Sequence, residues 1–346
     1  MLASNITSMS VMLSCSDFSG TLSFLVDTVG FQVKCIFPAD DPCEAGLVGH
    51  GLNLKLLLDH KVDHSVFHLE CSDMEAMRGV GDIVDGVLTL SALNGTQFIV
   101  APEVDDSAIP ELVEALAVSH LNEGARDCWK VGRAGMRYRD LVPSRLGGRY
   151  IASHIHIPVG GEVPDYVHFH RERFQMIFCH RGWVEVVYED QGTPFVLRAG
   201  DCVSQPPEIR HRVLRSSADL EVVEVGCPAV HRTFADPGLP LPNCDRVREP
   251  PREWSGQRFL HFQNEACSWK PCTASAEGRW PAALTSWRCK DTGMEGATGG
   301  LASVLLLEPE APGAVETSNC THSDELELLF VLRGSVRVIT HVKGGG

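Results

Sequence analysis

Short apolar and β-branched segments follow one another through the middle of the chain. They are Phe174–Cys179, Trp183–Tyr188, Phe195–Leu197 and Leu220–Val225. Turn residues separate them, at Arg181-Gly182, Asp190–Gly192, Ala199–Asp201 and Ser216–Asp219. Because no helical period lies between these segments, the pattern predicts a small β-barrel or jelly roll.

The first hundred residues have a different pattern. It predicts in order a strand, a helix, a strand, a turn and a strand: Met9–Leu13, Phe18–Val29, Phe31–Phe37, Gly46–Gly51 and Leu52–Leu58. A shortened second copy follows between Val66 and Glu103, as a strand, a helix-like segment and a strand: Val66–Leu69, Asp73–Arg78 and Thr96–Val100. The chain is therefore expected to be α+β and mostly β.

Two further segments divide the chain. Ser107–Leu121 has apolar residues at helical spacing, between the polar start Asp105–Ser107 and Gly124, which predicts a linker helix. Pro237–Pro251 is rich in proline and marks a boundary. We expect four parts, at residues 1–104, 105–128, 129–240 and 241–346.

Composition narrows the classes of function. A chain of 346 residues is too long for one small barrel, and its formal net charge of −15 opposes nucleic acid or an anionic membrane as the main partner. The 13 cysteines are scattered, odd in number and form no Cys-x-x-Cys pair, which is typical of reduced thiols. The start of the chain lacks the basic region of a signal peptide, and no apolar run is long enough to span a membrane. These features predict a cytoplasmic location.

Three histidines and a glutamine in the middle segment have the spacing of metal ligands. On a strand His168 and His170 point to the same side, Gln175 can face them after a slight bend, and His211 can close the site from another strand. Such a set suits a divalent transition metal, with iron as first choice and Mn, Ni, Cu or Zn as alternatives. The His-x-His pair alone is weak evidence, because a second one, His154-Ile155-His156, lies upstream. The alternative is a metal-free barrel with hydrogen-bonded histidines.

Residues 161 to 215 resemble the two motifs of the cupin superfamily, glycine-x5-His-x-His-x(3,4)-Glu-x6-glycine and glycine-x5-Pro-x-glycine-x2-His-x3-Asn. The matching residues are Gly161 (one position early, with Glu162 at the motif's glycine), His168, His170, Gln175 and Gly182, then Gly200, Pro206 and His211. Glu208 replaces a glycine and Arg215 an asparagine. The resemblance implies a central cupin barrel whose metal ligands are His168, His170, Gln175 and His211. Gln175 departs from the usual glutamate and leaves the site one negative charge short.

The N-terminal pattern, with Asp27–Phe31 and Pro38–Pro42, resembles the βαβββ module of glyoxalase-like (vicinal oxygen chelate) proteins. That family carries metal ligands on the first and last strands of each copy. Here only His68 and Glu103 fall near such positions, so we expect a non-catalytic module that binds a ligand or forms a dimer.

The C-terminal hundred residues repeat the first cupin spacing in part. A predicted strand, Gly300–Leu307, precedes Cys320, His322, Glu327 and Gly334. The resemblance implies a bicupin whose second barrel is truncated to a partial sheet, with Cys320, His322 and Glu327 as a weak second site. The open edge of this partial sheet would be able to pair with another chain or with the first barrel. A fragment or a wrongly assigned gene end is the alternative explanation.

These features favour a metal-binding cupin protein, with a dioxygenase-type oxidoreductase acting on a small organic molecule as the leading hypothesis. The alternatives are a non-catalytic protein that binds or senses a small ligand, and a metal-dependent isomerase or lyase. Tyr166, Cys179 and Glu185 are candidates for proton transfer or for support of the ligands, against a simpler role in packing. The family resemblance leaves a homodimer open.

Overall fold

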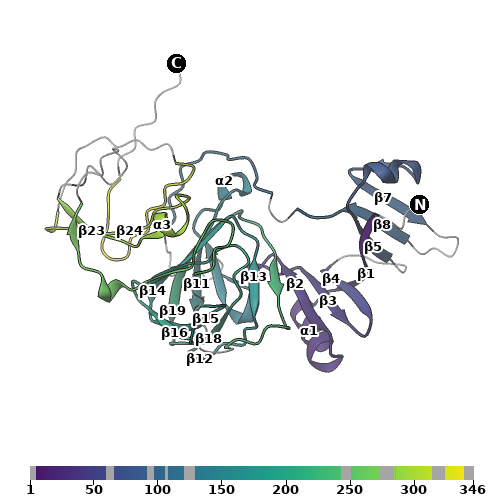
Figure 1. Cartoon of the computed structure of the whole chain (residues 1–346), viewed down its shortest axis with the longest axis horizontal. Coiled ribbons are helices and arrows are strands. Elements are labelled where there is room, and N and C mark those ends of the chain that lie inside the picture. Colours follow the sequence, from purple (N-terminus) through teal and green to yellow (C-terminus); the bar gives the residue numbers. More distant parts are fainter. Residues whose placement is uncertain are drawn as a thin grey trace, which may run out of the picture. The chain divides into compact units, whose positions relative to one another are not determined.

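The computed structural model describes residues 5–59, 66–91, 97–105, 108–120, 129–242, 251–272, 284, 286–313 and 324–338. The chain forms two compact units (Figure 1). The first comprises Met1–Cys267 and Asp291–Leu305, and the second Ser268–Lys290 and Leu306–Gly346. Because these units are defined by contacts alone, the four-part domain division stays a prediction.

The N-terminal part of the first unit is a mixed sheet. Its strands are β1 (Ile6–Cys15), β2 (Gln32–Phe37), β3 (Glu44–Gly49), β4 (Leu52–Leu58), β5 (Val66–Cys71), β6 (Ile83–Val84), β7 (Val87–Ser91) and β8 (Gln97–Pro102). They lie in the order β2-β3-β4-β1-β5-β8-β7-β6. Helix α1 (Phe18–Ser23) continues into a π-helical turn, η2 (Phe24–Thr28), and a 3-10 helix, η3 (Glu75–Gly79), follows β5. This order agrees with the strand and helix segments expected here, but the glyoxalase-like assignment stays a prediction.

The turn predicted at Gly46–Gly51 is wrong. These residues lie mostly in strand β3, and the chain reverses at His50-Gly51, where both residues have positive φ. Ala45 and Leu47 alternate into the interior and pack with the buried side chains of β4. That alternation buries one face of the strand and outweighs the effect of the two glycines within β3, Gly46 and Gly49.

The linker helix predicted over Ser107–Leu121 is also wrong, because residues 108–120 form no helix. Three residues of its expected apolar face are in solvent: Val113, Leu116 and Val118 are 58%, 73% and 74% exposed. The backbone N–H of Val113 donates instead to the carbonyl of Leu146, at 3.0 Å. A short amphipathic helix gains most of its stability from packing, and without a surface to cover it does not form.

The middle of the chain forms two facing sheets of a jelly-roll barrel (Figure 1). One contains β15 (Trp183–Tyr188), β16 (Phe195–Arg198), β18 (His211–Ser216), β13 (His168–His170) and β20 (Thr233–Ala235), with β12 (Gly161–Glu162) beside β18. The other contains β21 (Leu260–Phe262), β17 (Cys202–Ser204), β14 (Phe174–Arg181), β19 (Leu220–Cys227), β11 (Ile151–Ile157), β10 (Arg137–Asp140) and β9 (Lys130–Val131). The four strands predicted here are confirmed as β14, β15, β16 and β19. Short helices η5 (Arg133–Gly135), α2 (Arg145–Gly148), η6 (Asn264–Ala266) and α3 (Met294–Ala297) complete the unit.

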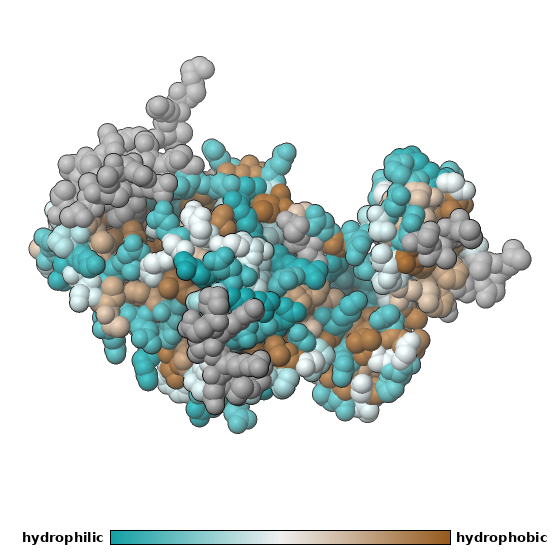
Figure 2. Space-filling view, in the orientation of Figure 1, coloured by the Kyte–Doolittle hydropathy of each residue, from teal (hydrophilic) through white to brown (hydrophobic). Residues whose placement is uncertain are grey.

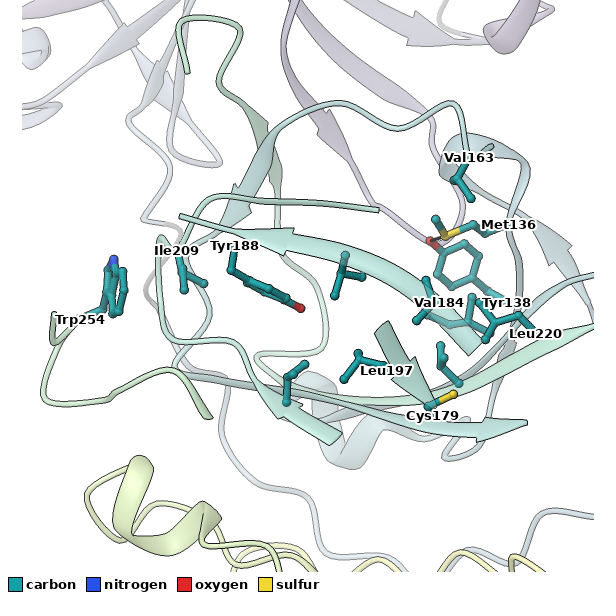
Figure 3. Packing of buried hydrophobic residues seen from close by; sticks show 14 residues of the cluster. Met136, Tyr138, Val163, Cys179, Val184, Tyr188, Leu197, Ile209, Leu220 and Trp254 are labelled. Atoms are coloured by element: carbon teal, nitrogen blue, oxygen red, sulfur yellow. Dashed lines mark hydrogen bonds between the residues drawn. The ribbon is translucent and has the colours of Figure 1, made fainter. Parts of the chain in front are cut away.

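The barrel interior is filled by apolar side chains from both sheets. Figure 3 shows Cys179, Val184 and Leu220 near one end and Tyr188 and Ile209 near the other. Val184 and Val186 of β15 and Leu220 and Val222 of β19 belong to this cluster, so every second residue of these stretches points into the barrel. This packing fixes the strand positions on which the polar site is built.

The barrel and the N-terminal sheet share one continuous set of strands. β2 pairs with β20, with Cys35 opposite Phe234 and Ile36 opposite Thr233. β20 in turn pairs with β13, which carries His168 and His170. β20 therefore lies between the strand that bears two candidate ligands and the N-terminal sheet.

Two turn positions of the cupin-like motifs have left-handed backbones. Gly182 joins β14 to β15 with φ 78°, and a Cβ there would lie 2.3 Å from Ser217 Oγ. Glu208 has φ 65° at the position where the motif has glycine. A side chain in this region costs about 1 kcal/mol, so Glu208 keeps the motif's conformation at an energetic cost.

The second unit contains a three-stranded sheet of β22 (Lys270–Pro271), β23 (Trp287–Asp291) and β24 (Leu305–Pro309), in that order. The strand expected from Gly300 begins only at Leu305. Residues 324–338 contain no strand. Cys320 and His322 lie outside the described residues, so the bicupin assignment stays a prediction.

The surface seen in Figure 2 mixes hydrophilic and hydrophobic residues, with hydrophobic atoms gathered over α1 and the neighbouring strands β3 and β4. Phe24, Val48 and Leu52 are exposed in this region. Within the described part of the chain, no helix is both long and apolar enough to cross a membrane.

Candidate metal centre

Three of the four predicted ligands meet inside the barrel. His168 on β13 and His211 on β18 are direct neighbours in the antiparallel register, and His170 follows two residues later on the same side of β13. One ring nitrogen from each of the three lies within 4.8 Å of the others. All three side chains are buried, and the ring centroids of His168 and His211 are 4.2 Å apart.

Backbone carbonyls orient two of these rings. His168 Nδ1 is 2.8 Å from the carbonyl oxygen of Tyr166, and His211 Nδ1 is 3.0 Å from that of Ile209. A carbonyl only accepts, so each Nδ1 carries the proton and donates it. The lone pair is then on Nε2, which is the form that binds a metal. The donor set therefore fits a divalent transition metal.

Burial keeps the three rings neutral. Desolvation lowers the pKa of His211 to about 4, and it lowers the pKa of His168 and of His170 well below the ordinary value. Neighbouring groups add to the effect, chiefly the Arg133 guanidinium at His168 and the His231 ring at His170. Neutral imidazole is the ligand form, so no proton has to be removed before metal binding at neutral pH.

A buried arginine contacts the site, which the sequence analysis missed. Arg133 Nη2 lies 3.0 Å from His168 Nε2, so the guanidinium donates to the lone pair that a metal would use. Its Nη1 pairs with Asp165, whose side chain is fully buried. Asp165 also accepts the backbone N–H groups of Tyr166 and Val213, both at 2.9 Å. A metal bound by His168 would have to displace the hydrogen bond from Arg133.

Gln175 takes part in a chain of hydrogen bonds. Its Nε2 donates to Glu224 Oε1 at 2.7 Å, and its Oε1 accepts from Gln205 Nε2 at 2.6 Å. The hydroxyl of Tyr188 donates to Gln205 Oε1 at 2.5 Å. A glutamate at position 175 would set two carboxyl groups against each other, which explains the amide here. The Oε1 atom that Gln175 would offer to a metal already accepts the hydrogen bond from Gln205. The role of Gln175 as the fourth ligand stays a prediction.

A second group with metal-ligand chemistry shares one of these histidines. His170, Glu172 and His231 each place a ligand atom within 4.8 Å of the others. Glu172 is 2% exposed, and neither carboxyl oxygen makes a hydrogen bond of normal geometry. Burial raises the pKa of this carboxyl well above its usual range and the nearby Glu224 adds to the shift, whereas the backbone amide of Cys227 opposes it. The alternation that sets His168 and His170 on one side of a strand extends to Glu172, so the sequence could have indicated Glu172 as a ligand. Nothing in the sequence indicated His231.

The sites open on one cavity of about 100 Å³ inside the barrel. One part of its wall is polar, formed by Arg133, His168, His170, Gln175, Gln205, His211, Glu224 and His231. The rest is apolar, formed by residues such as Ile155, Ile177, Val186, Leu197 and Val222. This lining suits a small molecule with a polar group at one end and an apolar body.

The three proposed supporting residues are not among those that line the cavity. Cys179 packs in the barrel core, where burial raises the pKa of its thiol to about 12. Glu185 forms an ion pair with Arg215 at 2.8 Å. Tyr166 packs beside the cluster around Phe18 and Ile36, and burial raises the pKa of its hydroxyl to about 12. The ring of Tyr166 also lies edge-on to His168, with 5.9 Å between centroids, so a supporting role of these three residues stays a prediction.

The weaker predicted sites are not assembled in the described residues. His68 lies opposite Ile99 in the parallel register of β5 and β8, and Glu103 lies beyond the end of β8 and is exposed. Glu103 lies four residues beyond Ile99, the residue opposite His68, which is a distance of roughly 13 Å along an extended chain. Glu327 is exposed, and its predicted companions Cys320 and His322 lie outside the described residues.

With this geometry established, a comparison of the chain with protein families gives one result. Residues 153–226 match the Cupin domain family. The match covers β11 to most of β19, and it supports the cupin superfamily for the barrel. No curated protein matches the chain.

Several solved structures are similar to parts of the chain. An RmlC-like cupin from Shewanella frigidimarina is 24% identical over 32% of this chain and 92% of its own, with a TM-score of 0.26. The polyketide cyclase RemF from Streptomyces resistomycificus is 18% identical over 35% of this chain and 89% of its own, with a TM-score of 0.28. A glyoxalase/bleomycin resistance protein/dioxygenase superfamily member from Vibrio splendidus is 19% identical over 28% of this chain and 98% of its own, with a TM-score of 0.22. Identities and TM-scores this low carry no conclusion about activity.

We expect the metal-free protein to lose stability as the pH falls from about 6.5 towards 4. His211 and His231 have a folded-state pKa of about 4, so below the unfolded pKa of about 6.5 the unfolded chain binds more protons than the cupin fold does. Each neutral histidine therefore contributes stability that is complete above pH 6.5. Urea unfolding at pH 7.5, 6 and 5 measures the slope. Replacing His211 with glutamine should flatten it, and an unchanged slope in that variant would contradict the assignment.

Proposed function

We propose that this is a metal-binding cupin protein that acts on a small organic molecule in the barrel cavity. The convergence of His168, His170 and His211 at that cavity is the observation that carries the proposal. A bound transition metal would supply Lewis acidity and a route for electrons. The match of residues 153–226 to the cupin domain supports the same conclusion.

The chain's own residues would bind and orient the substrate. A chain of hydrogen bonds forms one wall of the cavity and runs from Tyr188 through Gln205 and Gln175 to the Glu224 carboxyl. Because the last acceptor is this carboxyl, the direction of donation along the wall is fixed. The apolar wall opposite excludes water and holds the apolar part of the molecule. We propose an oxygen-dependent oxidation of a small organic acid, phenolic compound or thiol as the reaction.

A non-catalytic binding or sensing function is the second candidate. It is favoured by the hydrogen bond from Arg133 to His168 and by the engagement of both ends of the Gln175 amide. In this version the histidines stay in a metal-free polar network that holds a ligand. We further propose a cytoplasmic protein in which the N-terminal sheet binds a ligand or pairs two copies.

Elemental analysis of the purified protein, followed by oxygen uptake with panels of phenols, diketones and thiols, separates these functions. Stoichiometric iron with substrate-dependent oxygen uptake supports the oxidation. Turnover without oxygen uptake would replace it by an isomerase or lyase. A protein that takes up no metal at equimolar Fe, Mn, Ni, Cu or Zn, yet binds a small molecule, would overturn the proposed enzyme and favour the sensor.

A further inference from the structure

Glu172 and His231 face each other in an arrangement that needs either a proton or a cation between them. His231 Nδ1 lies 3.2 Å from the carbonyl oxygen of Pro228, so it carries the ring proton and donates it. The lone pair is then on Nε2, which lies 3.1 Å from Glu172 Oε1. These two atoms can share a single proton or both donate an electron pair to one cation, and no hydrogen bond of normal geometry from another group satisfies the carboxyl.

The carboxyl group is held in this place by its surroundings. Glu172 follows β13, and its Oε2 occupies the space beside Gly226, where a Cβ would lie 2.1 Å away. His170, on the strand before it, turns its ring at 88° to that of His231, with 5.1 Å between centroids. The glycine therefore leaves room for a carboxylate that points at two imidazoles.

We propose that His170, Glu172 and His231 form a second divalent-metal position, separate from the three-histidine position. Two imidazoles and one carboxylate are a ligand set for Fe(II), Mn(II), Co(II) or Zn(II). At the three-histidine position, by contrast, Arg133 already donates to the His168 lone pair. The carboxylate also supplies the negative charge that Gln175 does not.

The two positions exclude each other. A neutral imidazole has one lone pair, so His170 serves one ion at a time. Binding at Glu172 and His231 therefore leaves His168 bonded to Arg133 and keeps the three-histidine position empty. His170 and His231 both line the cavity, so an ion held here still faces a bound molecule.

Titration of metal-free protein with Co(II), followed by its visible absorption and by calorimetry, tests this position without any assay of activity. We expect Glu172→Gln and His231→Ala to weaken Co(II) binding by at least about tenfold. Gly226→Ala, which displaces the carboxyl without removing it, should act in the same direction. Circular dichroism and urea unfolding confirm that each variant folds.

His211→Ala is the matched variant for the other position, and it makes the outcomes distinct. Weaker binding in Glu172→Gln with unchanged binding in His211→Ala supports the second position and overturns the three-histidine ligand set. Weaker binding in both supports two alternating positions. Unchanged binding in Glu172→Gln overturns the inference, and the proposed function then stands if His211→Ala weakens binding.

Discussion

Replacing His170 with alanine is expected to remove metal binding altogether. His170 is the one residue common to both ligand groups, so its loss leaves each with two donors. We expect the affinity for Co(II) or Zn(II) to fall by at least about 100-fold, because two protein ligands seldom retain an ion that three hold. Elemental analysis after dialysis, together with calorimetric titration, gives the measurement.

The exposed His120 provides the control for this experiment. It lies in residues 108–120 and belongs to neither ligand group, so His120→Ala should bind metal as the unchanged protein does. Full metal binding by a folded His170→Ala protein would show that the metal is held elsewhere, and both proposed positions would be wrong.

Replacing Asp165 with asparagine is expected to destabilise the protein by about 3 to 5 kcal/mol. Asp165 is the buried partner of the Arg133 guanidinium, and asparagine leaves that charge uncompensated inside the barrel. The carboxylate also accepts two backbone N–H groups, of which asparagine can satisfy only one with its oxygen. The free energy of unfolding in urea at pH 7.5 measures the effect.

A double variant separates the charge from the packing. Arg133→Met with Asp165→Asn removes both charges and should recover much of the loss, since a buried pair can often be replaced by neutral groups of similar volume. Glu75→Gln removes one member of an exposed ion pair with Arg78 and should change stability too little to measure. A loss in Asp165→Asn no larger than that of Glu75→Gln would show that Arg133 finds another partner.

The barrel strands could be predicted from the sequence because the residues that specify each strand lie within it and in the turns beside it. Trp183–Tyr188 is a short run of β-branched and aromatic residues between two turns, and the structure forms β15 over the same residues. His168 and His170 share a face for the same reason, so their meeting with His211 followed from strand geometry and the motif spacing.

Other elements could not be predicted because burial by distant residues decides them. The apolar stripe of residues 107–121 predicted a helix, yet the backbone of Val113 bonds to Leu146, and the side chains of Val113, Leu116 and Val118 stay in solvent. The glycines of β3 indicated a turn, but packing against β4 makes the segment a strand. In both cases the conformational preference of the segment contributes less free energy than the burial or exposure of its apolar face.

By itself the sequence determined which residue types are available for chemistry and on which side of each strand they stand. Only the tertiary structure decided what those residues contact: Arg133 reaches His168, Gln175 lies between Gln205 and Glu224, and His231 comes to Glu172 from the loop between β19 and β20. The physical reason is that alternation along a strand is set by local backbone geometry. The partner of a buried polar group is set instead by closure of the barrel, which joins residues distant in sequence.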